Sequence, residues 1–144
     1  MPFVFWNVSD VTVKNFFVKQ PPLWSINIMN GTNMTLDNIL CNATATKAPY
    51  GIDWVQNTDG FGEIFIHPLI LRYDDTIDAT NIKLTNPYHQ GGDCVAVKPR
   101  SYNITVQNAT CHDDNGIAIG SLGQYLDDSS VENVVMTDVN VSIF

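Results

Sequence analysis

Positive charge is scarce in this chain. Seven lysines and arginines stand against fifteen aspartates and glutamates, which gives a formal net charge of −8 at pH 7. Nucleic acids and anionic membrane surfaces attract proteins through a positive field, so the charge balance argues against both as general partners. An acidic polysaccharide is compatible with this balance, because such a substrate needs only a local basic patch in a cleft.

Long apolar runs are also absent. The longest candidate, Ile64–Leu71, is interrupted by His67 and Pro68, and a membrane-spanning helix needs roughly 20 apolar residues. No stretch has a helical pattern. The first residues have neither the basic start nor the small-residue cleavage site of a signal peptide. We therefore expect a chain without a membrane partner and without its own secretion signal.

Cysteine is rare, with only Cys41, Cys94 and Cys111, whereas the Asn-x-Ser/Thr sequon is frequent. An odd number of cysteines leaves at least one unpaired within the chain. The sequons indicate a secreted glycoprotein, although several also fit the abundance of Asn and Thr in repeated turns. We therefore expect a secreted protein whose leader lies outside this chain. The predicted glycosylation sites are Asn7, Asn30, Asn33, Asn42, Asn103, Asn108 and Asn140.

A short repeat organises the chain: Asn or Asp, two apolar residues each followed by a variable one, and again Asn or Asp. Such a short strand cannot bury its apolar face alone, and stacking copies of it buries that face. An antiparallel sandwich would explain short strands but not one recurring hexapeptide. The pattern predicts a parallel β-helix of about five coils with asparagine ladders. The copies occupy residues 10–15, 33–38, 81–86, 103–108 and 133–138.

Residues 62–74 break this pattern, since they contain no copy of the repeat. They lie within the interval between the second and third copies, which is about twice as long as the intervals on either side of it. The long interval accommodates either two ordinary coils or one coil with an insertion of about a dozen residues. We interpret residues 1–144 as one partial β-helix domain with an insertion at 62–74.

Three motifs carry the candidate chemistry: Asn-Thr-Asp-Gly-Phe at 57–61, Gly-Gly-Asp-Cys-Val-Ala-Val-Lys at 91–98, and Asn-Gly-Ile-Ala-Ile-Gly-Ser-Leu-Gly at 115–123. In this order on this repeat, they make the chain resemble glycoside hydrolase family 28, the polygalacturonases and their relatives. The resemblance implies a right-handed parallel β-helix that hydrolyses polygalacturonate or rhamnogalacturonan with inversion, most similar to the fungal exo-acting branch. It implies no cofactor and no metal, and we expect a monomer.

The resemblance also assigns roles to residues. Asp59 and Asp93 match the carboxylates that activate water in an inverting hydrolase. Asn57, Asn115 and Lys98 are the expected substrate-binding residues. Gly92 stands where the family has the presumed general acid, a loss worth about 10²–10⁴-fold in rate.

Two further departures from the family pattern concern the surroundings of the site. The family's Arg-Ile-Lys element, which binds the substrate carboxylate, is absent from this chain, and we expect a solenoid truncated at both ends. We do not expect Asp113 or Asp114 to replace the missing acid.

The spacing between Cys94 and Cys111 is close to the length of one coil. Both this spacing and the resemblance predict a disulfide between them, which suits a secreted protein. Cys41 is expected to be a buried small residue. The three histidines, His67, His89 and His112, are interpreted as surface or turn residues.

Two alternatives to the enzyme remain open at the level of sequence. The missing acid at position 92 beside a retained cleft favours a pectin-binding module without activity. The missing ends and the segment at 62–74 instead favour a misread, non-functional gene product.

Overall fold

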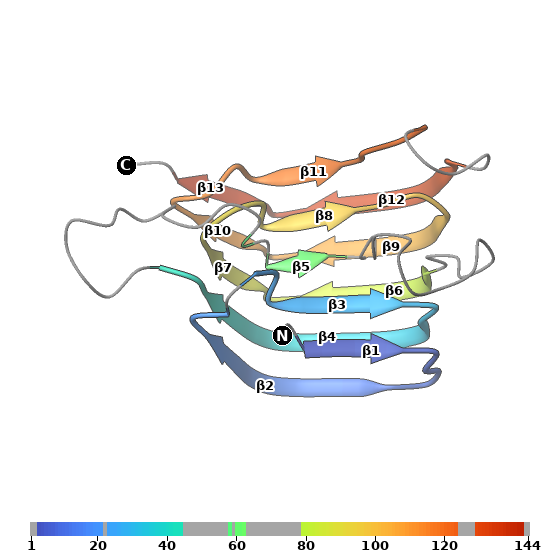
Figure 1. Cartoon of the computed structure of the whole chain (residues 1–144), viewed down its shortest axis with the longest axis horizontal. Helices are drawn as coiled ribbons and strands as arrows, with labels where there is room; N and C mark the ends of the chain where they lie inside the picture. Colours follow the sequence, from blue (N-terminus) through green and yellow to red (C-terminus); the bar gives the residue numbers. More distant parts are fainter. Residues whose placement is uncertain are drawn as a thin grey trace.

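The computed structural model describes residues 3–21, 23–44, 58, 60–62, 79–123 and 129–142. These residues form thirteen β-strands and no helix, and the strands stack into the five coils that the repeat predicts (Figure 1). The strands are β1 (Phe3–Trp6), β2 (Thr12–Lys19), β3 (Ile26–Met29), β4 (Thr32–Asn42), β5 (Phe61–Gly62), β6 (Ala79–Thr85), β7 (Tyr88–Gln90), β8 (Val95–Val97), β9 (Ser101–Gln107), β10 (Thr110–His112), β11 (Ile117–Ile119), β12 (Val131–Thr137) and β13 (Asn140–Ser142).

Each coil contributes strands to three faces. The first face contains β1, β3, β5, β8 and β11, each parallel to its neighbour. In the lower coils β2 and β4 bend, so that the first part of β4 pairs with β6 and the second part with β7. In the upper coils this path is divided into two strands, so that β6, β9 and β12 form the second face and β7, β10 and β13 form the third face.

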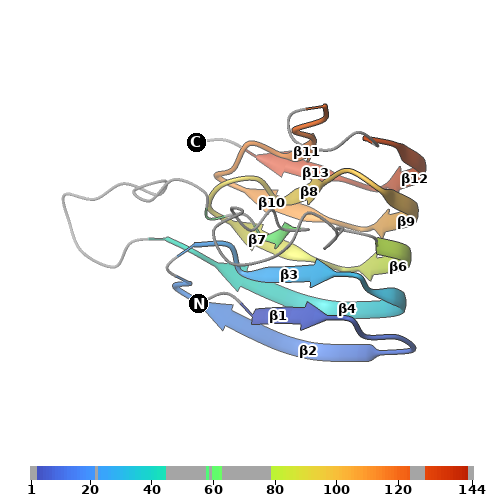
Figure 2. The same cartoon turned by 45° about the vertical axis from the view of Figure 1, so that its right-hand side comes forward.

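The winding direction follows from the two views. The first face lies in front with its strands running to the right, and the remaining strands return behind it while the coils rise from the N-terminus (Figures 1 and 2). The chain is therefore a right-handed parallel β-helix, as expected from the sequence. Among the described residues, no helix is long and apolar enough to cross a membrane.

Asparagines turn the chain at the corners of each coil. The first residue of every repeat copy has a positive φ of 55–58°, a conformation that Asn and Asp tolerate better than other non-glycine residues. Their side chains form a ladder, with Nδ2–Oδ1 distances of 2.8–3.1 Å between successive coils. The predicted asparagine ladder is thus confirmed, and its members are Asp10, Asn33, Asn81, Asn103 and Asn133.

The apolar positions of the repeat point into the coils and stack on one another. Met34 lies beside Ile82, and Ile82 beside Ile104. Leu36 and Leu84 form the neighbouring row, and all five side chains are at most 3% exposed. Burial of such a side chain stabilises the fold by about 1.5–3 kcal/mol, so the stacked rows supply the cohesion that an isolated coil lacks.

The long interval between the second and third copies of the repeat corresponds to one coil of the β-helix. Met34 in β4 pairs directly with Ile82 in β6, although the whole interval separates them in sequence. The alternative of two ordinary coils in this interval is therefore wrong, and the extra residues belong to one enlarged coil. The insertion predicted at 62–74 lies outside the described residues, apart from Gly62 in β5.

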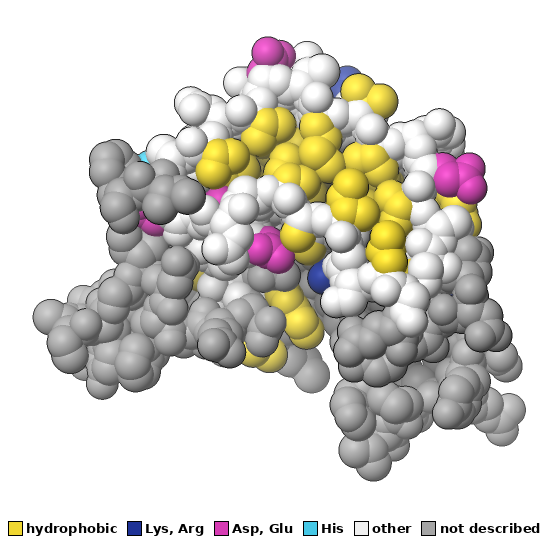
Figure 3. Space-filling view, turned by 90° about the horizontal axis from the view of Figure 1, so that it is seen from above, with side chains coloured by type: hydrophobic (Ala, Val, Ile, Leu, Met, Phe, Trp, Pro, Cys, Tyr) yellow, Lys and Arg dark blue, Asp and Glu magenta, His cyan; other side chains and the backbone are white. Residues whose placement is uncertain are grey.

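Hydrophobic side chains gather over the centre of the last described coil, seen from above in Figure 3. Inward-facing residues there, such as Val134 and Met136 in β12, are only partly buried and pack against the core of the coil below. The apolar interior of the solenoid therefore reaches the surface at this end.

Candidate active site

The described residues of the three motifs lie side by side where strands of the first face begin. Phe61 in β5 pairs with Val95 in β8, and Val95 pairs with Ile117 in β11. The residues just before these strands are also joined, because Gly60 N–H donates to the Asp93 carbonyl at 2.8 Å. Segments that are distant in sequence thus form one surface, because parallel stacking in register aligns equivalent positions of each coil.

Asp93 and Asn115 contact each other at this surface. Asn115 Nδ2 donates to Asp93 Oδ1 at 3.1 Å, in an exposed position. This hydrogen bond restrains the orientation of the Asp93 carboxylate. The geometry is that of a positioned carboxylate that can accept a proton from water.

The other predicted residues are less closely associated with this pair. Asp59 and Asn57 lie outside the described residues, whereas Thr58 and Gly60, on either side of position 59, are buried. Lys98 follows β8 and Asp93 precedes it, a separation of about 16 Å along an extended strand. The structure therefore joins Asp93 to Asn115 but does not place Lys98 at the same point.

Among the described residues, neither Asp113 nor Asp114 replaces the carboxyl group that is missing at Gly92. The side chain of Asp114 is completely buried, its Oδ1 accepts from Gly116 N–H at 2.7 Å, and its Oδ2 faces His89. Asp113 is 7% exposed, and its Oδ2 faces Gln90 and His112. Neither carboxylate projects toward solvent beside Asp93, which agrees with the expectation from sequence.

The predicted disulfide is present. Cys94 and Cys111 are bonded, with a Cα–Cα distance of 5.5 Å, and the bond ties the turn that carries Asp93 to β10. Closing a loop of this length stabilises a fold by about 3 kcal/mol in the chain-entropy description. Cys41 is buried with a free thiol, and desolvation by burial raises the pKa of this thiol to about 12.

His89 corrects the interpretation of the histidines. It was expected in a turn or at the surface, but it is completely buried in β7, between Cys41 and Cys111 of the adjacent coils. Its Nε2 lies 2.9 Å from the Thr58 carbonyl oxygen, and its Nδ1 lies 3.2 Å from Asp114 Oδ2. The sequence did contain a signal for this inward side chain, because Cys41, His89 and Cys111 stand at the same position relative to three successive copies of the repeat. His112 is one-third exposed, and His67 lies outside the described residues.

Tyr88 precedes His89 at the edge of the same cluster. Burial raises the pKa of the Tyr88 phenol, and the nearby carboxylates of Asp113 and Asp114 add to the shift. One possible metal-ligand atom from each of His89, Cys94 and Asp114 lies within 4.8 Å of the other two, which is close enough for a shared metal ion. The sulfur of Cys94 is bonded to Cys111, however, and both nitrogens of His89 already face oxygen atoms.

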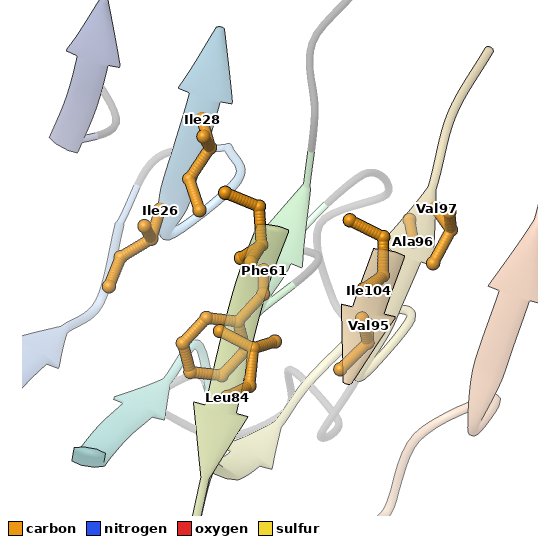
Figure 4. A pocket seen from close by; sticks show the side chains of 9 residues that line it. Ile26, Ile28, Phe61, Leu84, Val95, Ala96, Val97 and Ile104 are labelled. Carbon is orange, nitrogen blue, oxygen red and sulfur yellow. The ribbon is translucent and has the colours of Figure 1, made fainter. Parts of the chain in front are cut away.

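A cavity inside the coils is distinct from this surface. The side chains that line it are all apolar and include Ile26, Phe61, Leu84 and Val95 (Figure 4). A sugar acid needs polar partners for its hydroxyl and carboxylate groups. We therefore interpret the cavity as a packing feature of the core.

Gly60 is required where it lies, because the imidazole of His89 occupies the space that a side chain would need. A Cβ added there would lie 2.5 Å from His89 Cδ2 and 2.7 Å from the Cys94 carbonyl oxygen. We expect Gly60→Ala to lower the free energy of unfolding by about 1–3 kcal/mol through overpacking, measured by urea denaturation. Gly123→Ala is the control for an added methyl group, because a Cβ there meets no atom within 4 Å, although its φ of +69° adds backbone strain. A Gly60→Ala variant as stable as the parent chain would contradict the packing described here.

These features define a right-handed parallel β-helix with a carboxylate-bearing surface on one face. The family model "Glycosyl hydrolases family 28" matches residues 1–143. The chain therefore belongs to glycosyl hydrolase family 28, a family of glycosidases.

Curated fungal relatives are similar along nearly the whole chain. A protein of Neosartorya fischeri, provisionally named galacturan 1,4-alpha-galacturonidase C, is 63% identical over 98% of this chain and 32% of its own length. An Aspergillus niger protein with the same provisional name is 64% identical over 98% of this chain and 30% of its own length. An exopolygalacturonase of Cochliobolus carbonum is 33% identical over 93% of this chain and 27% of its own length. The chain thus spans about a third of the length of the relatives it matches.

Proposed function

We propose that this chain carries the catalytic surface of a secreted, exo-acting glycosidase that hydrolyses α-1,4-linked galacturonan with inversion. The contact between Asp93 and Asn115 carries the proposal, because it positions a carboxylate on the outer surface where three family motifs meet. In this proposal Asp93 and Asp59 activate the attacking water, Asn57 and Asn115 bind near the scissile bond, and Lys98 binds a carboxylate of a neighbouring sugar unit. The names of the fungal relatives support galacturonan as the polymer.

Secretion and glycosylation belong to the same proposal. The disulfide between Cys94 and Cys111 suits an oxidising compartment. Six of the seven sequon asparagines are exposed, and Asn42 is partly buried. We propose that the protein acts as a monomer outside the cell, with pectic polysaccharide as its partner.

Gly92 favours a second candidate, which is binding of pectic oligomers without turnover. A hydrolase needs an acid to protonate the leaving oxygen, and no described carboxylate beside Asp93 fills that role. The binding surface itself does not depend on this acid.

One experiment separates the candidates. The chain of residues 1–144 is incubated with trigalacturonate and with a neutral α-1,4-glucan trimer, and free galacturonate is followed by chromatography while binding is measured by calorimetry. Slow release of galacturonate from trigalacturonate alone supports the hydrolase, and binding without release supports the binding module. If neither release nor binding is detected, both candidates fail for this chain.

A further inference from the structure

A buried polar cluster behind the surface connects three coils. His89 belongs to β7 on the third face, Asp114 follows β10 one coil higher, and Thr58 precedes β5 on the first face. The side chains of His89 and Asp114 are both 0% exposed, and Thr58 is 2% exposed. No solvent molecule is needed for these contacts, since each polar atom of the His89 ring faces a protein oxygen.

The hydrogen bonds of His89 require an additional proton. The Thr58 carbonyl can only accept, so Nε2 of His89 must carry a hydrogen. In a neutral ring Nδ1 would then be bare and would face the carboxylate oxygen of Asp114 at 3.2 Å. Two facing lone pairs buried without solvent are strongly unfavourable. The pair must therefore hold one proton between Nδ1 and Oδ2, whichever atom carries it.

The ring is also held sterically. A Cβ at Gly91 would lie 3.2 Å from Cε1 and Nε2 of His89, and a Cβ at Gly60 would lie 2.5 Å from its Cδ2. Both glycines therefore leave room for the ring on the strand turns that carry the motifs. Thr58 in turn accepts Gly92 N–H through its Oγ1 at 3.0 Å, so the cluster links the first motif to the second.

We propose that His89 and Asp114 are positioning residues that hold Thr58 and Gly60 against the turn of Gly92 and Asp93. The proton-holding pair anchors the Thr58 carbonyl from behind, and Thr58 Oγ1 then fixes the turn at Gly92. The catalytic meaning of this positioning rests on the proposed function, whereas the positioning itself does not.

Two substitutions at Asp114 distinguish a positioning pair from simple packing. Asparagine retains every hydrogen bond, because its Oδ1 can accept Gly116 N–H while its Nδ2 donates to His89 Nδ1, and the ring then remains neutral with a hydrogen on Nε2. Leucine fills the space but leaves Nδ1 of the ring without its partner. Asp113→Asn is the matched control, since it makes the same change at the adjacent residue, whose Oδ2 faces Gln90 and His112 instead.

The main readout is amide hydrogen exchange of Gly60, Phe61 and Gly92, measured by NMR. We expect Asp114→Leu to accelerate exchange of these three amides about 10- to 100-fold. Asp114→Asn and Asp113→Asn should leave it within about twofold of the parent chain. Equal exchange in Asp114→Leu and Asp114→Asn would overturn the proposal. This readout needs no catalysis, so a chain that fails to hydrolyse galacturonan contradicts the proposed function and not the positioning.

A second measurement serves if Asp114→Leu does not fold. The parent chain should show a slowly exchanging proton, shifted to low field, that couples to Nδ1 of His89 or transfers magnetisation to Asp114. In Asp114→Asn this signal should be lost and the ring should show only the Nε2 proton. A parent chain without such a proton would overturn the proposal.

Where hydrolysis is measurable, Asp114→Asn should retain kcat, and Asp114→Leu should lower kcat more than it raises KM.

Discussion

Gly92→Asp is expected to raise the rate of galacturonan hydrolysis about 10²–10⁴-fold, which is the usual contribution of a general acid. The position immediately precedes Asp93, and its carbonyl accepts Asn115 N–H while its amide donates to Thr58. Gly92 is not among the described glycines with positive φ, so its backbone accommodates a side chain without leaving the regions that other residues adopt. An acid here would supply the proton that the leaving oxygen needs, while Asp93 activates the attacking water.

The matched control is Gly92→Asn, which adds a side chain of the same shape without an ionisable group. We expect it to remain at the rate of the parent chain, measured as galacturonate released from trigalacturonate under identical conditions. A Gly92→Asp variant that binds trigalacturonate but gains no activity over Gly92→Asn would show that position 92 does not supply the acid. Equal gains in both variants would assign the effect to backbone rigidity instead.

The repeat made most of the fold predictable. An Asn-flanked apolar hexapeptide specifies both the inward residues and the corners, because Asn adopts positive φ easily and its amide can bond to the coil above. The ladder from Asp10 to Asn133 follows from that rule alone. The size of the third coil did not follow, because the repeat fixes where strands begin and not how much chain connects them.

The contact between Asp93 and Asn115 follows from the register of the repeat. Asp93 and Asn115 hold equivalent places in successive coils, and the structure brings them to 3.1 Å. His89 was missed because its partners, Thr58 and Asp114, come from other faces and other coils. Such a cluster depends on how the interior is filled at a corner, which a strand pattern does not encode.

Asp93→Asn tests the carboxylate itself and is expected to abolish most of the activity. In the Gly92→Asp background we expect the rate of galacturonate release to fall about 10²–10⁴-fold, since an amide cannot take a proton from the attacking water. The side-chain oxygen of asparagine can still accept the hydrogen bond from Asn115 Nδ2, so the local geometry is retained. The dissociation constant of trigalacturonate, measured by calorimetry, should change by no more than about threefold. The neutral side chain is a weaker hydrogen-bond acceptor, but it also removes the repulsion between Asp93 and the carboxylates of the substrate, and these two effects oppose each other.

Asp113→Asn in the same background is the control, because it makes the same substitution at a carboxylate that faces Gln90 and His112. It should leave the rate unchanged. If Asp93→Asn retains activity, the water must be activated elsewhere, and the Asp93–Asn115 contact would then serve binding alone. Proton NMR of the first product decides the stereochemistry in the active variant: direct formation of the β-anomer from the α-linked substrate requires attack by water from the opposite side of the ring, which a positioned base such as Asp93 can promote.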